Sequence, residues 1–111
     1  MTYNHSVLTF IETRLFTRLA DDYLGADGLF ALQLHLLQHP DSGAIIQGSG
    51  GVRKLRWARP GTGKRGGLRI IYYLRTEQGQ VWLLTLYAKN VRDSIPGHVL
   101  KRIKEEIDEE G

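Results

Sequence analysis

Several kinds of residue are absent from this 111-residue sequence, and each absence narrows the class of protein. There is no cysteine, which excludes disulfides and thiolate metal ligands and fits a reducing cytoplasm. No apolar run approaches the roughly 18 residues of a membrane span. The start, MTYNHSVLTF, lacks the basic residues and long apolar centre of a signal peptide. We therefore expect one soluble domain in the cytoplasm, without membrane contact.

Acidic residues are absent from Ser42 through Thr76. Eight of the fifteen lysines and arginines lie in this stretch: Arg53, Lys54, Arg56, Arg59, Lys64, Arg65, Arg69 and Arg75. Both ends of the chain hold more acids than bases. The central excess of positive charge predicts an anionic partner, and nucleic acid is the commonest one. The alternative interpretation is a basic face that is only solvated.

The amino-terminal part predicts a strand followed by a helix. Residues 5–11 form a short apolar run that is typical of a strand. Thr13 can cap a helix in which Leu15, Leu19 and Tyr23 recur on one face. Gly25 is expected to end this helix.

A second helix is expected from Gly28 to His39, with Asp27 as its cap and Pro40 as its stop. The segment is apolar nearly all round, which predicts a helix buried on most sides. His35 and His39 share a helix face, but neither a carboxylate nor a cysteine lies nearby to complete a metal site. We interpret them as ordinary helix residues.

The rest of the chain predicts three strands and a last helix. A glycine-rich connector, residues 41–51, leads to strands at Val52–Ala58, Leu68–Leu74 and Val81–Ala88. The last helix starts at about Pro96, and its acid-rich end should fray because the helix dipole disfavours acids there. This order predicts an α+β fold with a small antiparallel sheet: strand, two helices, three-strand meander, carboxy-terminal helix. We expect the helices on one face and the basic residues on the other.

Side chains alternate across a strand, so the meander sorts its basic residues by face. Lys54 and Arg56 face one side of their strand, and Arg69 and Tyr73 share a side of the next strand. Arg53 and Arg75 are interpreted as charges at solvated edges, whereas Tyr72, Trp82 and Tyr87 are interpreted as core residues.

The glycine-rich turn resembles two nucleotide-binding motifs but fits neither. Residues 61–66 match G-x-G-x-x-G, yet a strand follows instead of the required helix, and position 86 is leucine instead of an acid. The turn also departs from the P-loop motif at two positions. Ala58 stands where the motif has its first glycine, and Arg65 stands where it has the Ser or Thr that binds magnesium. There is also no H-E-x-x-H, no nucleophile elbow, and no carboxylate cluster inside the basic segment to hold a catalytic metal. We expect no metal and no cofactor.

The basic segment suits metal-free phosphoryl transfer on RNA. The 2′-hydroxyl of the substrate attacks the adjacent phosphorus and the 5′-oxygen leaves, so the enzyme must align the attack and stabilise charge on the phosphoryl oxygens. Arginine stays charged and can bind two oxygens at once. A nearby Lys, Tyr or His could move the protons. Lys54, Arg56 and Arg69 fit this role if they share a face, and Lys89 could reach the same patch.

The ordered segments GSGGVRKLRWA, GKRGGLRIIYYL and VWLLTLYAKN resemble the RelE/HigB-type toxins of bacterial toxin–antitoxin modules, close to the HigB-like branch. The resemblance runs from about Phe10 to Lys104. It implies a small α+β protein that cleaves mRNA in the ribosomal A site. It also implies neutralisation by an antitoxin protein that carries a helix-turn-helix domain.

Family roles are carried over to matching positions of this sequence. The resemblance places the basic pair before the glycine-rich turn at Lys54 and Arg56, and the main phosphate-stabilising residue at Arg69. The basic position after the last strand is Lys89 or Asn90; if it is Asn90, a charge is lost and Lys89 must compensate.

The acid or base has no firm match; His98 is the nearest candidate and Tyr73 the second. The chain could instead be a non-catalytic RNA-binding module or an inactive toxin relative. A DNA-binding domain is disfavoured because no capped helix carries the basic cluster. Additional RNA-binding residues are expected at Arg53, Arg59, Lys64 and Arg65.

Overall fold

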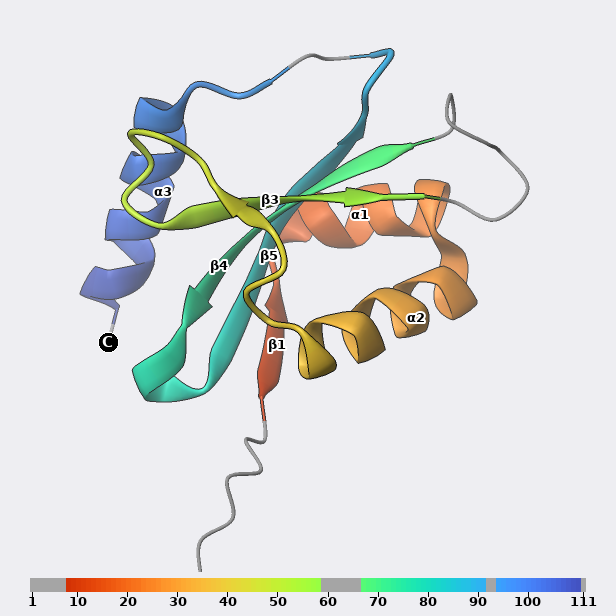
Figure 1. Cartoon of the computed structure of the whole chain (residues 1–111), viewed down its shortest axis with the longest axis horizontal. Coiled ribbons are helices and arrows are strands. Elements are labelled where there is room, and N and C mark those ends of the chain that lie inside the picture. Colours follow the sequence, from red (N-terminus) through yellow and green to blue (C-terminus); the bar gives the residue numbers. More distant parts are fainter. Residues whose placement is uncertain (1–7, 59–66, 92–93, 111) are drawn as a thin grey trace, which may run out of the picture.

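A five-stranded sheet forms the centre of the computed structural model, which describes residues 8–58, 67–91 and 94–110 (Figure 1). The strand order is β1-β5-β4-β3-β2. β1 runs parallel to β5, and every other neighbouring pair is antiparallel. The strands are β1 (Thr9–Glu12), β2 (Ala44–Ile45), β3 (Val52–Trp57), β4 (Leu68–Arg75) and β5 (Gln80–Ala88), and the helices are α1 (Arg14–Tyr23), α2 (Gly25–Gln38) and α3 (Gly97–Glu109).

The expected α+β class and the β3–β4–β5 meander are confirmed. The expectation of a wholly antiparallel sheet is wrong, because β1 pairs with β5 in parallel. Parallel pairing needs a long crossover, and α1 and α2 lie in the chain between β1 and the meander. The connector also contributes β2, a two-residue strand that was not predicted.

The beginning of α1 follows the sequence closely. The Thr13 hydroxyl accepts a hydrogen bond from the Phe16 N–H at 3.0 Å and donates one to the Leu84 carbonyl at 2.7 Å. Thr13 therefore caps the helix and also attaches it to β5.

The predicted limits and burial of α2 need correction. The helix starts at Gly25, which has a φ of +68°, and Asp27 lies inside its first turn instead of capping it. Only one side of α2 is buried, through Leu32 and Leu36, whereas Phe30 is 61% exposed. The apolar composition of α2 therefore leaves an exposed apolar surface.

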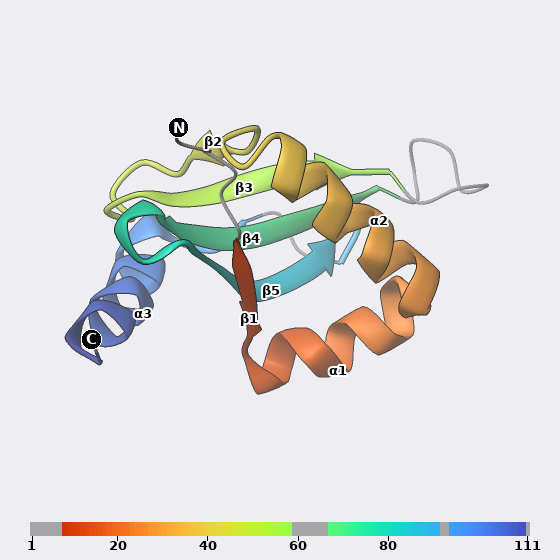
Figure 2. The same cartoon turned by 90° about the horizontal axis from the view of Figure 1, so that it is seen from below.

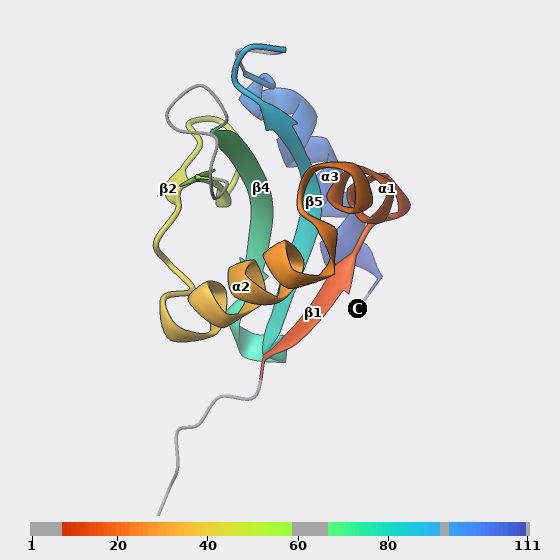
Figure 3. The ribbon, with the colours of Figure 1, turned by 90° about the vertical axis from the view of Figure 1, so that its right-hand side faces the viewer.

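Helices cover both faces of the sheet, contrary to the prediction of a free face. α1 and α2 contribute to one core, around Phe16, Leu32 and Tyr72. α3 contributes Leu100 and Ile107 to a second core on the opposite face. Figure 3 shows β4 and β5 between α2 on one side and α3 on the other. In Figure 2, α3 lies toward one end of the molecule, away from α2.

The end of α3 is attached to β4, so the expectation that it frays is wrong. The Asp108 carboxylate accepts a hydrogen bond from the Tyr73 hydroxyl at 2.9 Å and pairs with the Lys104 ammonium at 2.9 Å. It also pairs with the Arg75 guanidinium at 3.4 Å. Arg75 is therefore a half-buried ion-pair partner, with a side chain only 9% exposed, and not a solvated edge charge.

The start of α3 packs against the connector. A Cβ atom added at Gly97 would overlap the carbonyl oxygen of Gln47. The connector is itself ordered by the buried Ser49, whose hydroxyl donates to the Ile46 carbonyl at 2.7 Å and accepts from the Val52 N–H at 3.0 Å. Within the described ranges, no helix has the length and apolar character needed to cross a membrane.

Candidate anion-binding site

Lys54, Arg56 and Arg69 form what we call the cationic face. Val52, two positions before Lys54, packs in the α3-side core, and Leu55 packs in the opposite core. Alternation along β3 therefore places Lys54 and Arg56 on the α3 side. On β4, Ile71 belongs to the α3-side core, which places Arg69 on the same side.

Arg56 and Arg69, the arginine pair, lie directly opposite each other across β3 and β4. The Lys89 N–H donates a hydrogen bond to the Gly67 carbonyl at 3.4 Å. In an antiparallel pair, the backbone groups of every second residue point toward the same neighbouring strand. Those of Arg69, two residues after Gly67, therefore also point toward β5. Arg69 and Arg56 thus form a non-hydrogen-bonded pair, in which the Cα atoms are about 4.5 Å apart. Like charges directly opposite each other are destabilising. Their position suggests a role other than stability.

No carboxylate of residues 8–58, 67–91 and 94–110 pairs with the cationic face. Arg56 is exposed, and Lys54 and Arg69 are half-buried. The single described hydrogen bond of the Arg69 side chain is long, 3.4 Å from Nη1 to the Leu68 carbonyl. Unneutralised guanidinium groups in this arrangement can bind the oxygens of a phosphate.

Lys89 lies at the same end of the sheet as the arginine pair. It is exposed and follows β5 directly, and its backbone bond to Gly67 places it beside the start of β4. Asn90, the other candidate for this position, is also exposed in the turn that follows. The backbone is therefore compatible with a cation from Lys89 next to Arg69.

The two acid–base candidates lie away from the arginine pair. Tyr73 is four residues beyond Arg69 on β4, a distance of about 13 Å along a strand. Burial and the hydrogen bond to Asp108 raise the pKa of Tyr73, so its hydroxyl stays protonated. His98 is exposed at the start of α3, whose Gly97 packs on the connector that precedes β3. Arg56, in contrast, lies near the end of β3 that is remote from this connector, so His98 and the arginine pair are at different ends of the strand.

Arg53 projects to the opposite side from the cationic face. Its Nη1 donates to the Gly43 carbonyl at 2.7 Å and to the Asp41 carbonyl at 3.1 Å. Arg53 thus holds the connector and is not a solvated edge charge. The other expected RNA-binding residues, Arg59, Lys64 and Arg65, lie outside the described residues.

The aromatic residues interpreted as core are buried or half-buried. Tyr72 and Tyr87 are 0% and 7% exposed, and Trp82 is half-buried against the α3-side core. His35 packs against Trp57 with ring centroids 5.3 Å apart, and its Nε2 lies 2.9 Å from the Ser42 hydroxyl. No group of three potential metal ligands occurs in the part of the chain that the structure describes.

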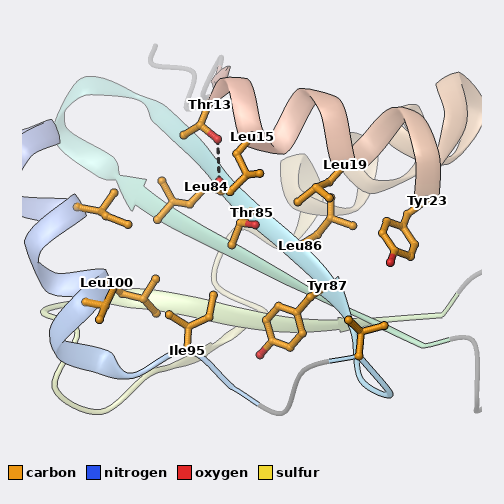
Figure 4. A pocket seen from close by; sticks show the side chains of 13 residues that line it. Thr13, Leu15, Leu19, Tyr23, Leu84, Thr85, Leu86, Tyr87, Ile95 and Leu100 are labelled. Carbon is orange, nitrogen blue, oxygen red and sulfur yellow. Dashed lines mark hydrogen bonds between the residues drawn. The ribbon is translucent and has the colours of Figure 1, made fainter.

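Sequence reasoning missed an apolar groove of about 650 Å³ next to the cationic face. It lies between α1, the second half of β5 and α3 (Figure 4). Tyr87 lines the groove and is also the register partner of Arg69, so the groove and the arginine pair are adjacent. The groove residues are far apart in sequence, and no local pattern could have identified them together.

Among the solved structures that share this fold are two from E. coli, although no protein-family model matches the chain. One is a mutant of the E. coli toxin RelE in the free state, with a TM-score of 0.58, 13% sequence identity, and coverage of 88% of this chain and 96% of that chain. The other is the intact E. coli RelBE toxin–antitoxin complex, with a TM-score of 0.54, 14% identity, and coverage of 74% and 96%. The chain therefore has a RelE-like fold.

Proposed function

We propose that this protein is the toxin of a toxin–antitoxin pair and that it cleaves mRNA in the ribosomal A site. The arginine pair, which has no carboxylate partner among the described residues, on a RelE-like fold is the observation that carries the proposal. The resemblance of the sequence to RelE/HigB-type toxins supports the same function. The finer placement in the HigB-like branch rests on the sequence segments alone.

In the proposed reaction the arginine pair binds the non-bridging oxygens of the scissile phosphate. The 2′-oxygen forms a bond to phosphorus and passes its proton to a water molecule, and the bond from phosphorus to the 5′-oxygen breaks. The products are a 2′,3′-cyclic phosphate and a 5′-hydroxyl. Charge that develops on the phosphoryl oxygens is stabilised by Arg56 and Arg69, which are held by neighbouring strands and need little reorganisation.

We assign to Lys54 the role of general acid that protonates the leaving 5′-oxygen. It shares the cationic face and lies on β3 two residues before Arg56, whereas the Tyr73 hydroxyl is engaged by Asp108. An ammonium group can donate the proton that the departing oxygen needs. Lys89 adds positive charge at the other side of Arg69.

Induced expression in a bacterium tests this function. Wild-type protein should arrest growth and produce new mRNA 5′ ends in phase with codons, and Arg69→Ala should abolish both effects. Arg102→Ala is the matched control, because Arg102 is an exposed arginine on α3 and is not part of the cationic face. Normal growth and intact mRNA in cells that contain ample soluble wild-type protein would refute the proposal.

A non-catalytic RNA-binding module is the second candidate, because neither acid–base candidate of the sequence lies beside the arginine pair. Purified protein with programmed ribosomes separates the two functions. A toxin yields cut mRNA with a 2′,3′-cyclic phosphate end, whereas a binding module retains RNA without new ends.

The proposed function includes a protein partner, an antitoxin with a helix-turn-helix domain. Co-expression of the protein encoded by the adjacent gene should restore growth, and the two proteins should purify together.

A further inference from the structure

The large apolar side chains that the described residues expose fall into two groups. Four of them line the apolar groove: Leu15, Val91, Val99 and Ile103. The other four lie elsewhere: Phe30, Leu34 and Leu37 on α2, and Ile45 on β2. Phe30 is 61% exposed, and Leu34 and Leu37 are each 43% exposed. Apolar side chains gain free energy on leaving water, so three of them along one helix mark an interaction surface.

The exposed residues of α2 form one continuous face. After Gly25 they are Ala26, Asp27, Phe30, Ala31, Leu34, Leu37 and Gln38. Their spacing of three and four positions places them on the same side of the helix, which has 3.6 residues per turn. We call this side the outer face of α2; the other side packs into the core through Leu32 and Leu36. The same spacing forms the seam between two helices in a coiled coil, so the outer face fits a second helix.

Charge argues against nucleic acid as the occupant of the outer face. α2 contains no lysine or arginine, and Asp27 is its only acidic residue. A surface that binds nucleic acid needs clustered Lys and Arg to neutralise phosphates. The cationic face lies on the other side of the sheet, with α3 (Figure 3). A molecule that covers the outer face of α2 therefore leaves the cationic face open.

The two ends of the outer face are complementary to each other. Asp27, at the start of α2, carries a hydrogen-bond acceptor, and Gln38, at the end, carries an amide donor. If two copies of α2 pack antiparallel about a two-fold axis beside Leu34, Asp27 of each copy lies near Gln38 of the other. Phe30 and Leu37 are each about 5 Å along the helix from this axis, on opposite sides, and so face each other. A parallel pair would instead place the two Asp27 carboxylates together, which is unfavourable.

We propose that two copies of this chain form a two-fold symmetric dimer through the outer faces of α2, with the two helices antiparallel. Such isologous contacts are the commonest kind in homo-oligomers. The dimer does not depend on the proposed function, and it leaves both cationic faces open. One helix from each copy buries less than the roughly 800 Å² per partner of a standard interface, so the dimer should dissociate at roughly micromolar concentrations.

Sedimentation velocity of the full-length protein tests the dimer. Between roughly 1 and 300 µM, wild-type protein should change from monomer to dimer. Leu34→Glu places two carboxylates beside the two-fold axis and should raise the dissociation constant about tenfold or more. Val99→Glu is the matched control, because Val99 is 40% exposed, close to the 43% of Leu34, but lies on α3 in the groove. Urea denaturation should show that both variants are folded.

Introduced cysteines test the antiparallel arrangement, because the chain has no cysteine of its own. Under mild oxidation Leu34→Cys should form a disulfide with its own copy. Phe30→Cys alone should not, because its two copies lie about 10 Å apart along the helix axes, beyond the reach of a disulfide. A mixture of Phe30→Cys and Leu37→Cys should form the disulfide between the two variants. Val99→Cys is the control and should stay monomeric in the non-reducing gel.

Four results overturn the inference. The first is wild-type protein that stays monomeric throughout the concentration range. The second is a dimer that Val99→Glu dissociates and Leu34→Glu leaves intact, which assigns the contact to the groove. The third is a Phe30→Cys variant that links to itself and not to Leu37→Cys, which shows a parallel pair. The fourth is a monomer whose binding to the protein encoded by the adjacent gene is abolished by Leu34→Glu, which assigns the outer face to that protein.

Discussion

Replacing Arg56 by glutamine should make the protein more stable and less active. Arg56 and Arg69 are register partners with Cα atoms about 4.5 Å apart, and no described carboxylate offsets their charges. Like charges directly opposite each other on a sheet cost roughly 0.2–1 kcal/mol. Arg56→Gln should therefore raise the free energy of unfolding by up to about 1 kcal/mol. In a domain of this size that corresponds to at most about 4 °C in Tm.

The same substitution at Arg53, three positions earlier on β3, should have the opposite effect on stability. Arg53 donates to the Asp41 and Gly43 carbonyls, and Arg53→Gln loses these charge-assisted bonds at a cost of about 1–2 kcal/mol. Urea denaturation of both variants and the wild type measures the free energies, and ribosome-dependent mRNA cleavage measures activity. A fall in stability for Arg56→Gln comparable to that of Arg53→Gln would show that Arg56 is structural, and the reasoning would fail.

Three further predictions concern the packing around the site. The Lys104 ammonium and then the Tyr73 hydroxyl lower the pKa of Asp108. The stabilising effect of the Asp108 carboxylate is therefore complete above about pH 5 and is lost as pH falls through the folded pKa. Asp108→Asn should flatten the acid limb of a Tm-against-pH curve. Gly97→Ala should lower Tm and increase protease cutting near the start of α3, because the added Cβ overlaps the connector backbone. Tyr72→Phe should lower the free energy of unfolding by about 1–3 kcal/mol in urea denaturation, because the Gly43 N–H and the Pro40 carbonyl lose their hydrogen-bond partner.

Local chemistry accounts for the elements that the sequence predicted well. Thr13 caps α1 with its own side chain, and Gly79 adopts the left-handed conformation, with a φ of +65°, that closes the hairpin between β4 and β5. The alternation of Lys54 and Arg56 with Leu55 identified which side of β3 each side chain faces. These features depend on residues within a few positions of one another.

Contacts between distant parts of the chain give several predicted site residues partners that the sequence did not show. Tyr73 was a candidate acid or base from its face of β4, but Asp108, 35 positions away, binds its hydroxyl. Arg53 was a candidate for RNA binding, but its partners are backbone carbonyls, which no side-chain pattern reveals. Arg75 was interpreted as solvated, but it pairs with the carboxylate of Asp108, which is distant in the sequence.

The sequence by itself determined the α+β class, the meander and the common side of Lys54 and Arg56 on their strand, because strand alternation and helix capping act over a few residues. Only the tertiary structure decided that β1 stops beside Leu83, that Arg69 shares the face of Lys54 and Arg56, and that an apolar groove lies between α1, β5 and α3. These features depend on how far paired elements extend in space, and that is set by long-range packing of the two cores.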